Sequence, residues 1–393
     1  MMSELLESRW VDTKNALLEG LQGNKKSVMA ATLENTRKYL SESATAGATS
    51  AGNVATLNRV ILPVIRRVMP TVIANELVGV QPMTGPVGQI HTLRVRYSDT
   101  VAANGGVVGT SAGEEALSPF KIAEQYSGAN TGKAASTAVL EGAAGNRMSI
   151  QILKQTVEAK TRKLSARWTF EAAQDAQSMH GIDVEAEIMA ALAQEITAEI
   201  DQEVLNSLDT LAGAAAQTYN QAAVSGTATF VGDEHAALAV QINRVSNLIA
   251  QRTRRGAGNW AVVSPFALTI LQSATTSAFA RTTEGTFEAP TNTKMVGTLN
   301  NAMKVYVNTY AADNAAVLIG YKGSSESDAA AFYCPYIPLM SSGVVLDPGT
   351  FEPTVSFMTR YGYVELNNTA SSLGNAADYL GKVDITSGNV SFS

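Results

Sequence analysis

Four prolines recur at short intervals in the aromatic-rich stretch of residues 317–363, namely Pro335, Pro338, Pro348 and Pro353. Proline fixes φ and donates no backbone hydrogen bond, so strands that contain it are confined to sheet edges or are bent. The stretch also carries no catalytic motif. We therefore predict short or bent strands here, which contact neighbouring segments more readily than they build a deep core.

The chain is long and poor in charge. Its 393 residues exceed the size at which a single core usually stops growing, so two or more lobes are expected. Hydrophobic residues make up 45% and charged residues only 16%, against roughly 25% charged residues in typical soluble domains. A surface so poor in charge favours contact with other protein, and the net charge of −6 opposes binding to nucleic-acid phosphates.

Cysteine usage and the amino terminus indicate the compartment. Cys334 is the single cysteine, which excludes a disulfide framework and fits a reducing cytosol. Residues 1–10 are charged and lack a continuous apolar core, so no signal peptide is expected. No apolar run approaches the roughly 20 residues that cross a bilayer, and we expect no membrane association.

Residues 1–42 show the periodicity of two short amphipathic helices with a break at 20–24. Six acidic and six basic residues cancel in this region, which argues against a basic DNA-binding arm. A linker of small residues follows at 43–53, and a proline-punctuated arm continues to residue 88. The helices need a partner for their apolar stripes, since helices of this length are marginal alone.

Two segments alternate polar and apolar residues with the period of a half-buried strand, 93–97 and 164–170. Between them, residues 99–155 are rich in Gly, Ala and Ser and have no strong period. We therefore predict one long two-stranded hairpin over 89–170, with an elaborated tip.

A long helix is predicted after Asp183, which is a suitable N-cap. Apolar residues then recur every four positions, a spacing that makes the apolar face wind round the helix. The row consists of Ile188, Leu192, Ile196, Ile200, Val204 and Leu208. Further on, residues 234–290 predict a helix, a strand at 260–263 and a second helix, which indicates a compact α/β lobe. The last third of the chain predicts short strands.

Seven sequence motifs, in one order along the chain, closely resemble the major capsid proteins of tailed bacteriophages, specifically the T-even-like myovirus branch. They are GVQPM-x-GP-x-GQI at 79–90, IDQEV at 200–204, NWAVVSP at 259–265, VGTLN at 296–300, YKGSS at 321–325, FYCPYIPL at 332–339 and TRYG at 359–362. The resemblance implies the α+β Hong Kong 97-like capsid fold, with an N-arm, an extended hairpin loop, a peripheral domain and an axial domain.

The resemblance also implies a domain layout. Beyond the N-terminal helices (1–42), the linker and N-arm (43–88) and the extended hairpin (89–170), it places a peripheral domain with a spine helix at 171–232. The axial domain is expected at 233–330, and peripheral-domain strands with a C-terminal tail at 331–393.

The function implied is that of a structural subunit of an icosahedral head, which self-assembles into hexamers and pentamers around double-stranded DNA. The implied partners are scaffold, portal and decoration or vertex proteins. The implied location is the virion, after assembly in the bacterial host cytoplasm. Two alternatives in the same class are a vertex-specific paralogue and a nanocompartment shell protein. An alternative of another class is a soluble α/β enzyme that uses the lobe around Trp260, which the missing catalytic constellation disfavours.

The search for chemistry predicts no catalytic, cofactor or metal site. His91, His180 and His235 lie far apart and lack metal-ligand spacing. The loop at 128–134 differs from a phosphate-binding loop in its glycine spacing and lacks the Ser or Thr that would bind magnesium. An acidic row, Glu195, Glu199 and Glu203, is interpreted as a solvated or partner-facing helix side, because no second cluster of oxygens accompanies it.

Candidate inter-subunit residues are the Arg252, Arg254 and Arg255 cluster, together with Lys121 and Lys133 in the hairpin. Around a capsomer axis the arginines would need carboxylates from adjacent copies, and a solvated turn after a helix is the alternative. Lysines on this hairpin crosslink in some capsid proteins of this fold. The family also loses its amino terminus to a protease that cuts after Leu/Ile-x-Glu, and residues 40–42 fit this pattern, with the cut after Glu42.

Overall fold

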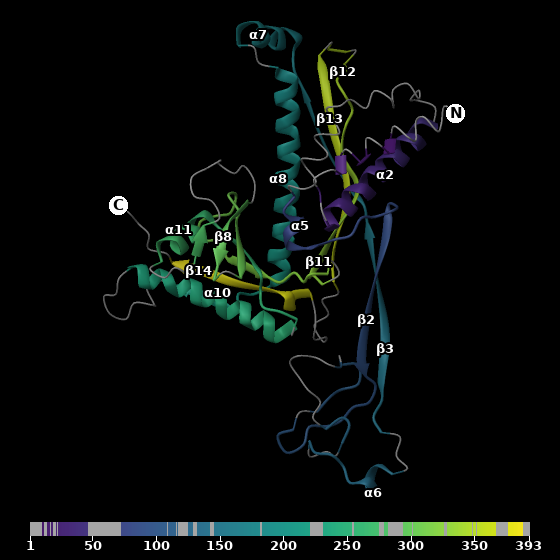
Figure 1. Cartoon of the computed structure of the whole chain (residues 1–393), viewed down its shortest axis with the longest axis vertical. Helices are drawn as coiled ribbons and strands as arrows, with labels where there is room; N and C mark the ends of the chain where they lie inside the picture. The colour runs from purple at the N-terminus through teal and green to yellow at the C-terminus, as the bar shows by residue number, and fades with distance from the viewer. Residues whose placement is uncertain are drawn as a thin grey trace.

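The structure is a computed structural model that describes most of the chain (Figure 1). The described residues are 10–11, 14–15, 17–18, 21, 23–45, 72–107, 109–114, 116, 125–128, 132–141, 145–180, 183–220, 231–253, 255–274, 279–281, 294–300, 302–325, 328–347, 349–350, 352–366 and 376–387.

The elements alternate between helices and strands along the chain. The helices are α2 (Gly23–Thr45), α5 (Ala74–Leu77), α6 (Thr137–Leu140), α7 (Phe170–His180), α8 (Val184–Ala212), α10 (Val231–Thr253), α11 (Pro265–Ser273) and the 3-10 helix η1 (Ala376–Tyr379). The strands are β1 (Gly79–Val80), β2 (Val87–Tyr97), β3 (Met148–Glu158), β4 (Lys160–Arg167), β5 (Gln217–Asn220), β6 (Trp260–Val263), β7 (Phe279–Arg281), β8 (Lys294–Leu299), β9 (Met303–Val307), β10 (Val317–Gly320), β11 (Ala331–Ser341), β12 (Val345–Leu346), β13 (Pro353–Glu365) and β14 (Leu380–Ser387).

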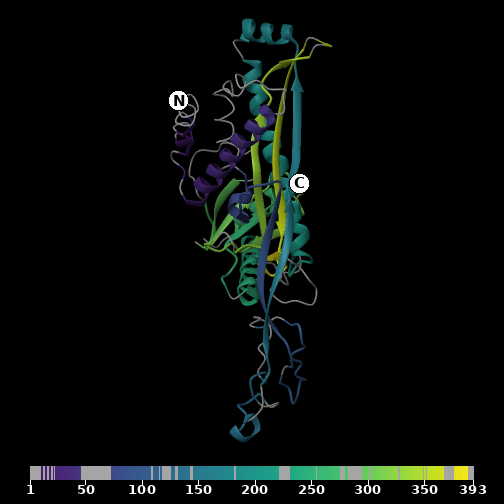
Figure 2. The ribbon, with the colours of Figure 1, turned by 90° about the vertical axis from the view of Figure 1, so that its right-hand side faces the viewer.

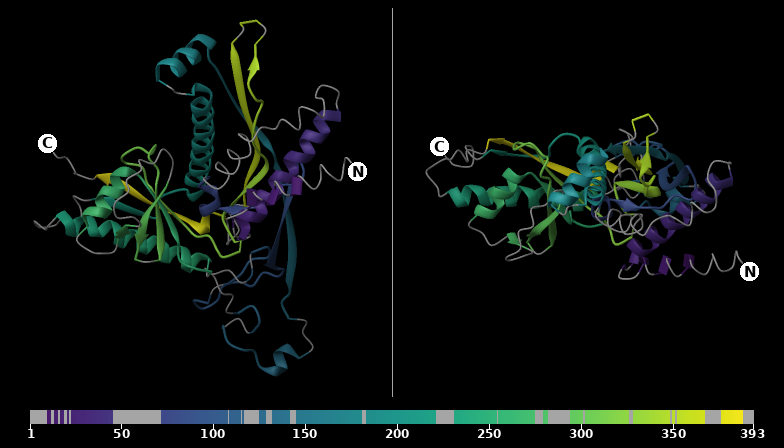
Figure 3. Two further views of the ribbon diagram at one scale, coloured as in Figure 1. Left: turned by 45° about the horizontal axis from the view of Figure 1, so that its top comes forward. Right: turned by 90° about the horizontal axis from the view of Figure 1, so that it is seen from above.

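The molecule is elongated, and its edge-on view is thin (Figure 2). Seen from above, the lobe that contains α10 and α11 projects from one side of α8, while α2 lies on the other side (Figure 3). The β2–β3 hairpin extends away from the body at one end (Figure 1). Within the described residues, no helix is both long and apolar enough to span a bilayer.

The first sheet contradicts the expectation that strands around the prolines are short or build little core, but agrees with irregular strands there. Its order is β1-β11-β13-β12, with β4 also paired to β13, and β11 and β13 are 11 and 13 residues long. Most of β11 is buried. Its register shifts occur between Pro335 and Ile337 and between Ile337 and Met340, so the prolines cause irregular pairing rather than strand termination. At these shifts a side chain satisfies a carbonyl of β11, since Thr359 Oγ1 donates to the Ile337 carbonyl at 3.0 Å.

Helix α8 confirms the predicted long helix. The Asp183 carboxylate accepts from the backbone N–H of Glu185 at 3.1 Å and of Ala186 at 3.4 Å, as an N-cap does. Five of the six residues in the predicted apolar row are buried, and the sixth, Ile188, is half-buried and packs against the same core. The helix contacts β4, β13, η1 and β14, so its winding face meets different elements.

The hairpin exists, but the predicted pairing of its strands is wrong. Strand β2 pairs antiparallel with β3 over all 11 residues, whereas β4, which covers most of the segment expected to be the second arm, pairs with β13 of the body. The side chains on one face of β4, such as Leu164 and Ala166, pack against the main core. Burial on that face therefore fixes the pairing of β4 to the body.

The α/β lobe is confirmed, with α10, β6 and α11 in the predicted order. Its seven-stranded sheet has the order β5-β14-β10-β6-β9-β8-β7. Two of these strands lie outside the expected axial domain, because β5 comes before residue 233 and β14 comes after residue 331. β14 pairs with β10, and β5 pairs with β14, so the sheet of this lobe extends beyond both expected boundaries. Local composition does not reveal partners that are so far apart in sequence.

The amino-terminal helices pack on their own chain. Residues 10–11, 14–15 and 17–18 are helical and α2 starts at Gly23, which confirms the break. In α2, Val28, Met29 and Leu33 are buried in the same core as α8. Since α2 runs to Thr45, the expected linker begins later than residue 43, and residues 46–71 lie outside the described part of the chain.

One carboxylate is buried where the N-arm meets α8. Asp201 is 1% exposed, and its Oδ1 accepts from the backbone N–H of Ile73 at 2.8 Å. Its Oδ2 has no hydrogen-bond partner. Burial raises the pKa of Asp201 to about 7, although the bond from Ile73 acts in the opposite direction.

Replacing Asp201 with asparagine is expected to stabilise the fold at neutral pH. The folded pKa lies above the usual value of 3.8, so the ionised carboxylate destabilises the fold increasingly as pH rises from about 4 to 7, and the cost then stays constant. Asn keeps the acceptor for Ile73 and carries no charge. Denaturation should therefore show a gain of about 4 kcal/mol at pH 8 and little change at pH 4.

The exposed Asp175→Asn in α7 is the matched control and should change stability little at either pH. A destabilisation by Asp201→Asn that is equal at both pH values would contradict the role of ionisation.

Candidate functional site

The hairpin carries an uncovered apolar face. Leu93 lies opposite Ile152, and Val95 lies opposite Ile150, so these side chains share one face of the two-stranded sheet. Leu93, Ile150 and Ile152 are 63, 69 and 65% exposed. Met148, which comes two residues before Ile150 in β3, is 53% exposed. We call Leu93, Met148, Ile150 and Ile152 the hairpin face.

The hairpin is fixed to the body at its base. There, Met83 and Val157 form a buried cluster with Phe332 and Cys334 of β11. The Gln155 side chain donates to the Glu365 carbonyl at 2.9 Å. Gly362 allows this close approach, because a Cβ atom there would lie 2.5 Å from Val157 Cγ2. The part beyond the base, which carries the hairpin face, extends away from the body (Figure 1).

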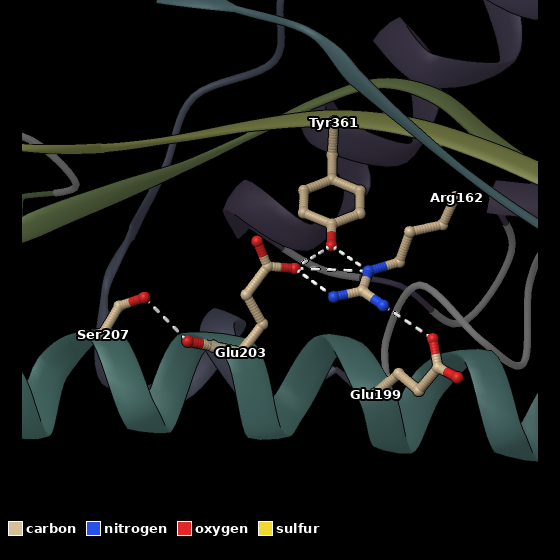
Figure 4. A network of polar contacts seen from close by, with 5 residues as sticks. All are labelled: Arg162, Glu199, Glu203, Ser207 and Tyr361. Carbon is tan, nitrogen blue, oxygen red and sulfur yellow. Dashed lines mark hydrogen bonds and ion pairs between the residues drawn. The ribbon is translucent and has the colours of Figure 1, made fainter.

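A polar network joins β4, α8 and β13 (Figure 4). The guanidinium of Arg162 donates to Glu199 Oε2 at 2.6 Å, to Glu203 Oε2 at 2.5 Å and to the Tyr361 hydroxyl at 2.6 Å. The Tyr361 hydroxyl in turn donates to Glu203. Burial alone would raise the pKa of Glu203, but the bonds from Tyr361 and Arg162 bring it below its usual value.

For two of its three members, this network corrects the interpretation of the acidic row as solvated or partner-facing. Glu199 and Glu203 are paired with an arginine of the same subunit, while Glu195 is exposed. The network therefore fixes the long helix to the sheet. Within the described residues, no group of three or more His, Cys, Asp or Glu side chains is placed to hold a metal ion.

The turn after α10 contains the predicted arginine cluster. Arg255 Nη1 lies 2.6 Å from Asp328 Oδ1, and the Tyr379 hydroxyl donates to the same oxygen at 3.3 Å. Gly256 packs closely on Tyr321, since a Cβ atom would lie 2.5 Å from its ring. Arg255 therefore has a carboxylate partner within its own chain. Arg252 lies half-buried in the last turn of α10.

The remaining predicted residues are dispersed. Lys133 is exposed near the far end of the hairpin, whereas Lys121 and Arg254 lie outside the described residues. Glu42 lies within α2 and not in a linker. Of the predicted residues that the structure describes, Lys133 lies in the hairpin and Arg252 and Arg255 lie at the end of α10 and in the turn after it, so these three do not form one site.

The three histidines and the single cysteine lie in different parts of the structure. His91 is exposed, and His180 is the last residue of α7. His235 is 4% exposed and its Nδ1 contacts Ser273 Oγ at 2.6 Å. Cys334 is buried, which raises the pKa of its thiol to about 11, so the thiolate nucleophile is not formed at neutral pH.

The sequence interpretation missed the residues of β3. The alternation of Met148, Ile150 and Ile152 with Ser149 and Gln151 is the signal of a strand with one apolar face. It lies at the end of a stretch that otherwise lacks a period, which the sequence analysis assigns to the hairpin tip. Arg162 was missed because its partners are distant in sequence.

Comparison with protein families gives one match to most of the chain. The model of the major capsid protein Gp23 matches residues 54–385. This range contains the described elements from α5 to η1, residues 380–385 of β14 and all seven motifs.

Curated relatives carry the same description. The major capsid protein of Enterobacteria phage T4 is 30% identical over 425 residues, which covers 86% of this chain and 80% of the relative. That of Vibrio phage KVP40 is 29% identical over 417 residues, covering 84% and 80%. That of Salmonella phage ViI is 28% identical over 404 residues, covering 92% and 90%.

Solved structures with a related chain include one from Mycobacterium phage Bobi, at a TM-score of 0.49 and 14% identity over 80% of this chain and 90% of that chain. Another is the capsid of Myoviridae phage XM1, at a TM-score of 0.42 and 10% identity over 80% and 91%.

The family match covers most of the chain, and this extent shows which family the chain belongs to. It confirms the resemblance that the seven motifs indicated, and with it the α+β capsid fold. This chain therefore belongs to the Gp23 major capsid protein family and is a structural subunit that assembles with copies of itself into the icosahedral shell of a phage head.

Proposed function

We propose that the subunit forms hexamers and pentamers in which the hairpin face of each copy lies on a neighbouring copy. The observation that supports this most is the exposure of Leu93, Ile150 and Ile152, each above 60%, on a ribbon that is attached to the body at its base. An isolated two-stranded ribbon is marginal in water. A neighbouring subunit would supply the cover that its own chain lacks.

The free energy of the hairpin contact suits a lattice that assembles cooperatively. Burying one of these side chains contributes roughly 1–2 kcal/mol, so a single hairpin contact is modest. Each subunit of a closed shell both donates a hairpin and receives one, and simultaneous contacts reinforce each other. The shell would enclose double-stranded DNA without sequence-specific contacts, in keeping with the net charge of −6.

The proposal includes further partners and a domain layout. Scaffold, portal and decoration or vertex proteins are the partners implied, with assembly in the host cytoplasm. We place the α/β lobe near the capsomer axis, where Arg252, Arg254 and Arg255 would contact adjacent copies in addition to the internal Arg255–Asp328 pair. Lys121 and Lys133 remain candidate inter-subunit residues of the hairpin, and Glu42 remains a candidate cleavage site.

Hydrogen exchange measured before and after assembly tests the hairpin contact. Peptides that cover 87–97 and 148–158 should exchange more slowly in assembled shells than in the unassembled chain, because a neighbour excludes water and suppresses opening of the ribbon. Peptides from the buried part of α8 serve as the internal control and should change little. Equal exchange of the hairpin in both states would contradict the proposal.

A further inference from the structure

Helix α2 is packed firmly on the first sheet. Val28, Met29 and Leu33 are 4, 2 and 1% exposed, and they share a buried cluster with Tyr333 and Leu339 of β11. Burial of three large apolar side chains is enough to hold a helix on a sheet. The helix also has a polar tie to α5, since Lys25 Nζ lies 2.7 Å from Glu76 Oε1.

One buried side chain of α2 bridges the sheet and the hairpin base. Asn35 is 8% exposed, and its Nδ2 donates to the Met83 carbonyl at 2.6 Å and to the Tyr336 carbonyl at 3.0 Å. The Tyr336 carbonyl is available because the β11–β13 register shifts between Pro335 and Ile337. A primary amide has two N–H donors, so one asparagine can join both carbonyls.

Met83 lies where the direction of the hairpin is set. It comes just before β2, and its backbone N–H donates to the Pro335 carbonyl at 3.0 Å. Its side chain packs with Val157 of β3. Gly88 of β2 is close to both, since a Cβ atom there would lie 3.0 Å from Val157 and 3.5 Å from Met83. Movement of the hairpin relative to the sheet must therefore displace Met83.

We propose that α2 is a strap that fixes the angle between the β2–β3 hairpin and the first sheet, with Asn35 as the residue that fastens it. While α2 is in place, the hairpin has one orientation. When α2 leaves, Met83 and Tyr336 lose their shared donor and the hairpin can adopt other angles. Because Glu42 lies within α2, a cut after it would leave the strap held only by these non-covalent contacts.

Distance measurements between spin labels on the full-length, unassembled chain test the strap. Cysteines introduced at Ser149 in β3 and Glu195 in α8, both exposed, report the hairpin angle, and the native Cys334 is buried. The chain with α2 intact should give a single narrow distance distribution. Asn35→Ala should lose this narrow distribution and give a broad one, as should a chain that lacks residues 1–45.

Two further variants test whether the change in the distance distribution depends on the N–H donors of Asn35. Asn35→Asp keeps the size of the side chain but removes both N–H donors, so it should broaden the distribution as Asn35→Ala does. Lys26→Ala, at an exposed position of the same helix, is the control and should keep the narrow distribution. An unchanged narrow distribution in Asn35→Asp and in the chain without residues 1–45 would overturn the proposal.

Discussion

Replacing both Leu93 and Ile152 with aspartate is expected to abolish shell assembly while the subunit still folds. The two side chains are paired across the hairpin and are 63 and 65% exposed, so the isolated subunit loses little packing. In a shell, each copy would place two carboxylates in an apolar contact, and burying an unpaired charge costs several kcal/mol. Sedimentation velocity should show capsomers or monomers and no shells, with an unchanged circular dichroism spectrum.

The control places the same charges on the other face of the same strand. Ser149→Asp and Gln151→Asp are at exposed positions of β3 that point away from the hairpin face, because side chains alternate along a strand. This double variant should assemble like the original chain. Normal shells from the Leu93→Asp, Ile152→Asp variant would contradict the proposed contact.

Replacing Phe357 with alanine is expected to have the largest effect on the stability of the subunit itself. Phe357 is 1% exposed and lies in β13, opposite Ser341 of β11 and Leu164 of β4. Removing a buried phenylalanine leaves a cavity between sheet and helix and typically costs about 3–5 kcal/mol. Urea denaturation of the unassembled chain should show a loss of this size.

Two comparisons identify the cause of that loss. Phe357→Leu retains most of the volume and should cost about 1 kcal/mol. Phe170→Ala removes the same ring from a position that is 49% exposed and should cost less than Phe357→Ala. Equal losses for Phe170→Ala and Phe357→Ala would mean that burial at the sheet is not the cause.

The helices could be predicted because their signals are local. The N-cap Asp183 and the four-residue apolar spacing are both within α8, and the strand at 260–263 was predicted at its observed bounds. The seven motifs, in one order along the chain, indicated the protein family. These features depend on residues that are neighbours along the chain.

Strand partners could not be predicted in the same way. β14 joins β10 across about 60 residues and β4 joins β13 across about 190, and period-2 patterns do not encode the partner of a strand. The prolines of β11 led to the wrong prediction of short strands for a related reason. Where the register shifts beside them, the Tyr336 and Ile337 carbonyls accept from the side chains of Asn35 and Thr359, which are distant in sequence, so a central strand tolerates the prolines.

The hairpin face was predictable in part. The alternation at 148–152 indicates a strand, but only the structure shows that its apolar side is left uncovered by the body. The Arg162 network was not predictable, because two acidic residues on a helix and one arginine on a strand meet only when the sheet is assembled.

The most direct test of the proposed assembly is electron cryomicroscopy of particles assembled from the full-length chain. We expect closed icosahedral shells in which Leu93, Ile150 and Ile152 of each hairpin are covered by a neighbouring subunit. Particles that do not close, or closed shells in which this face remains open to solvent, would contradict it.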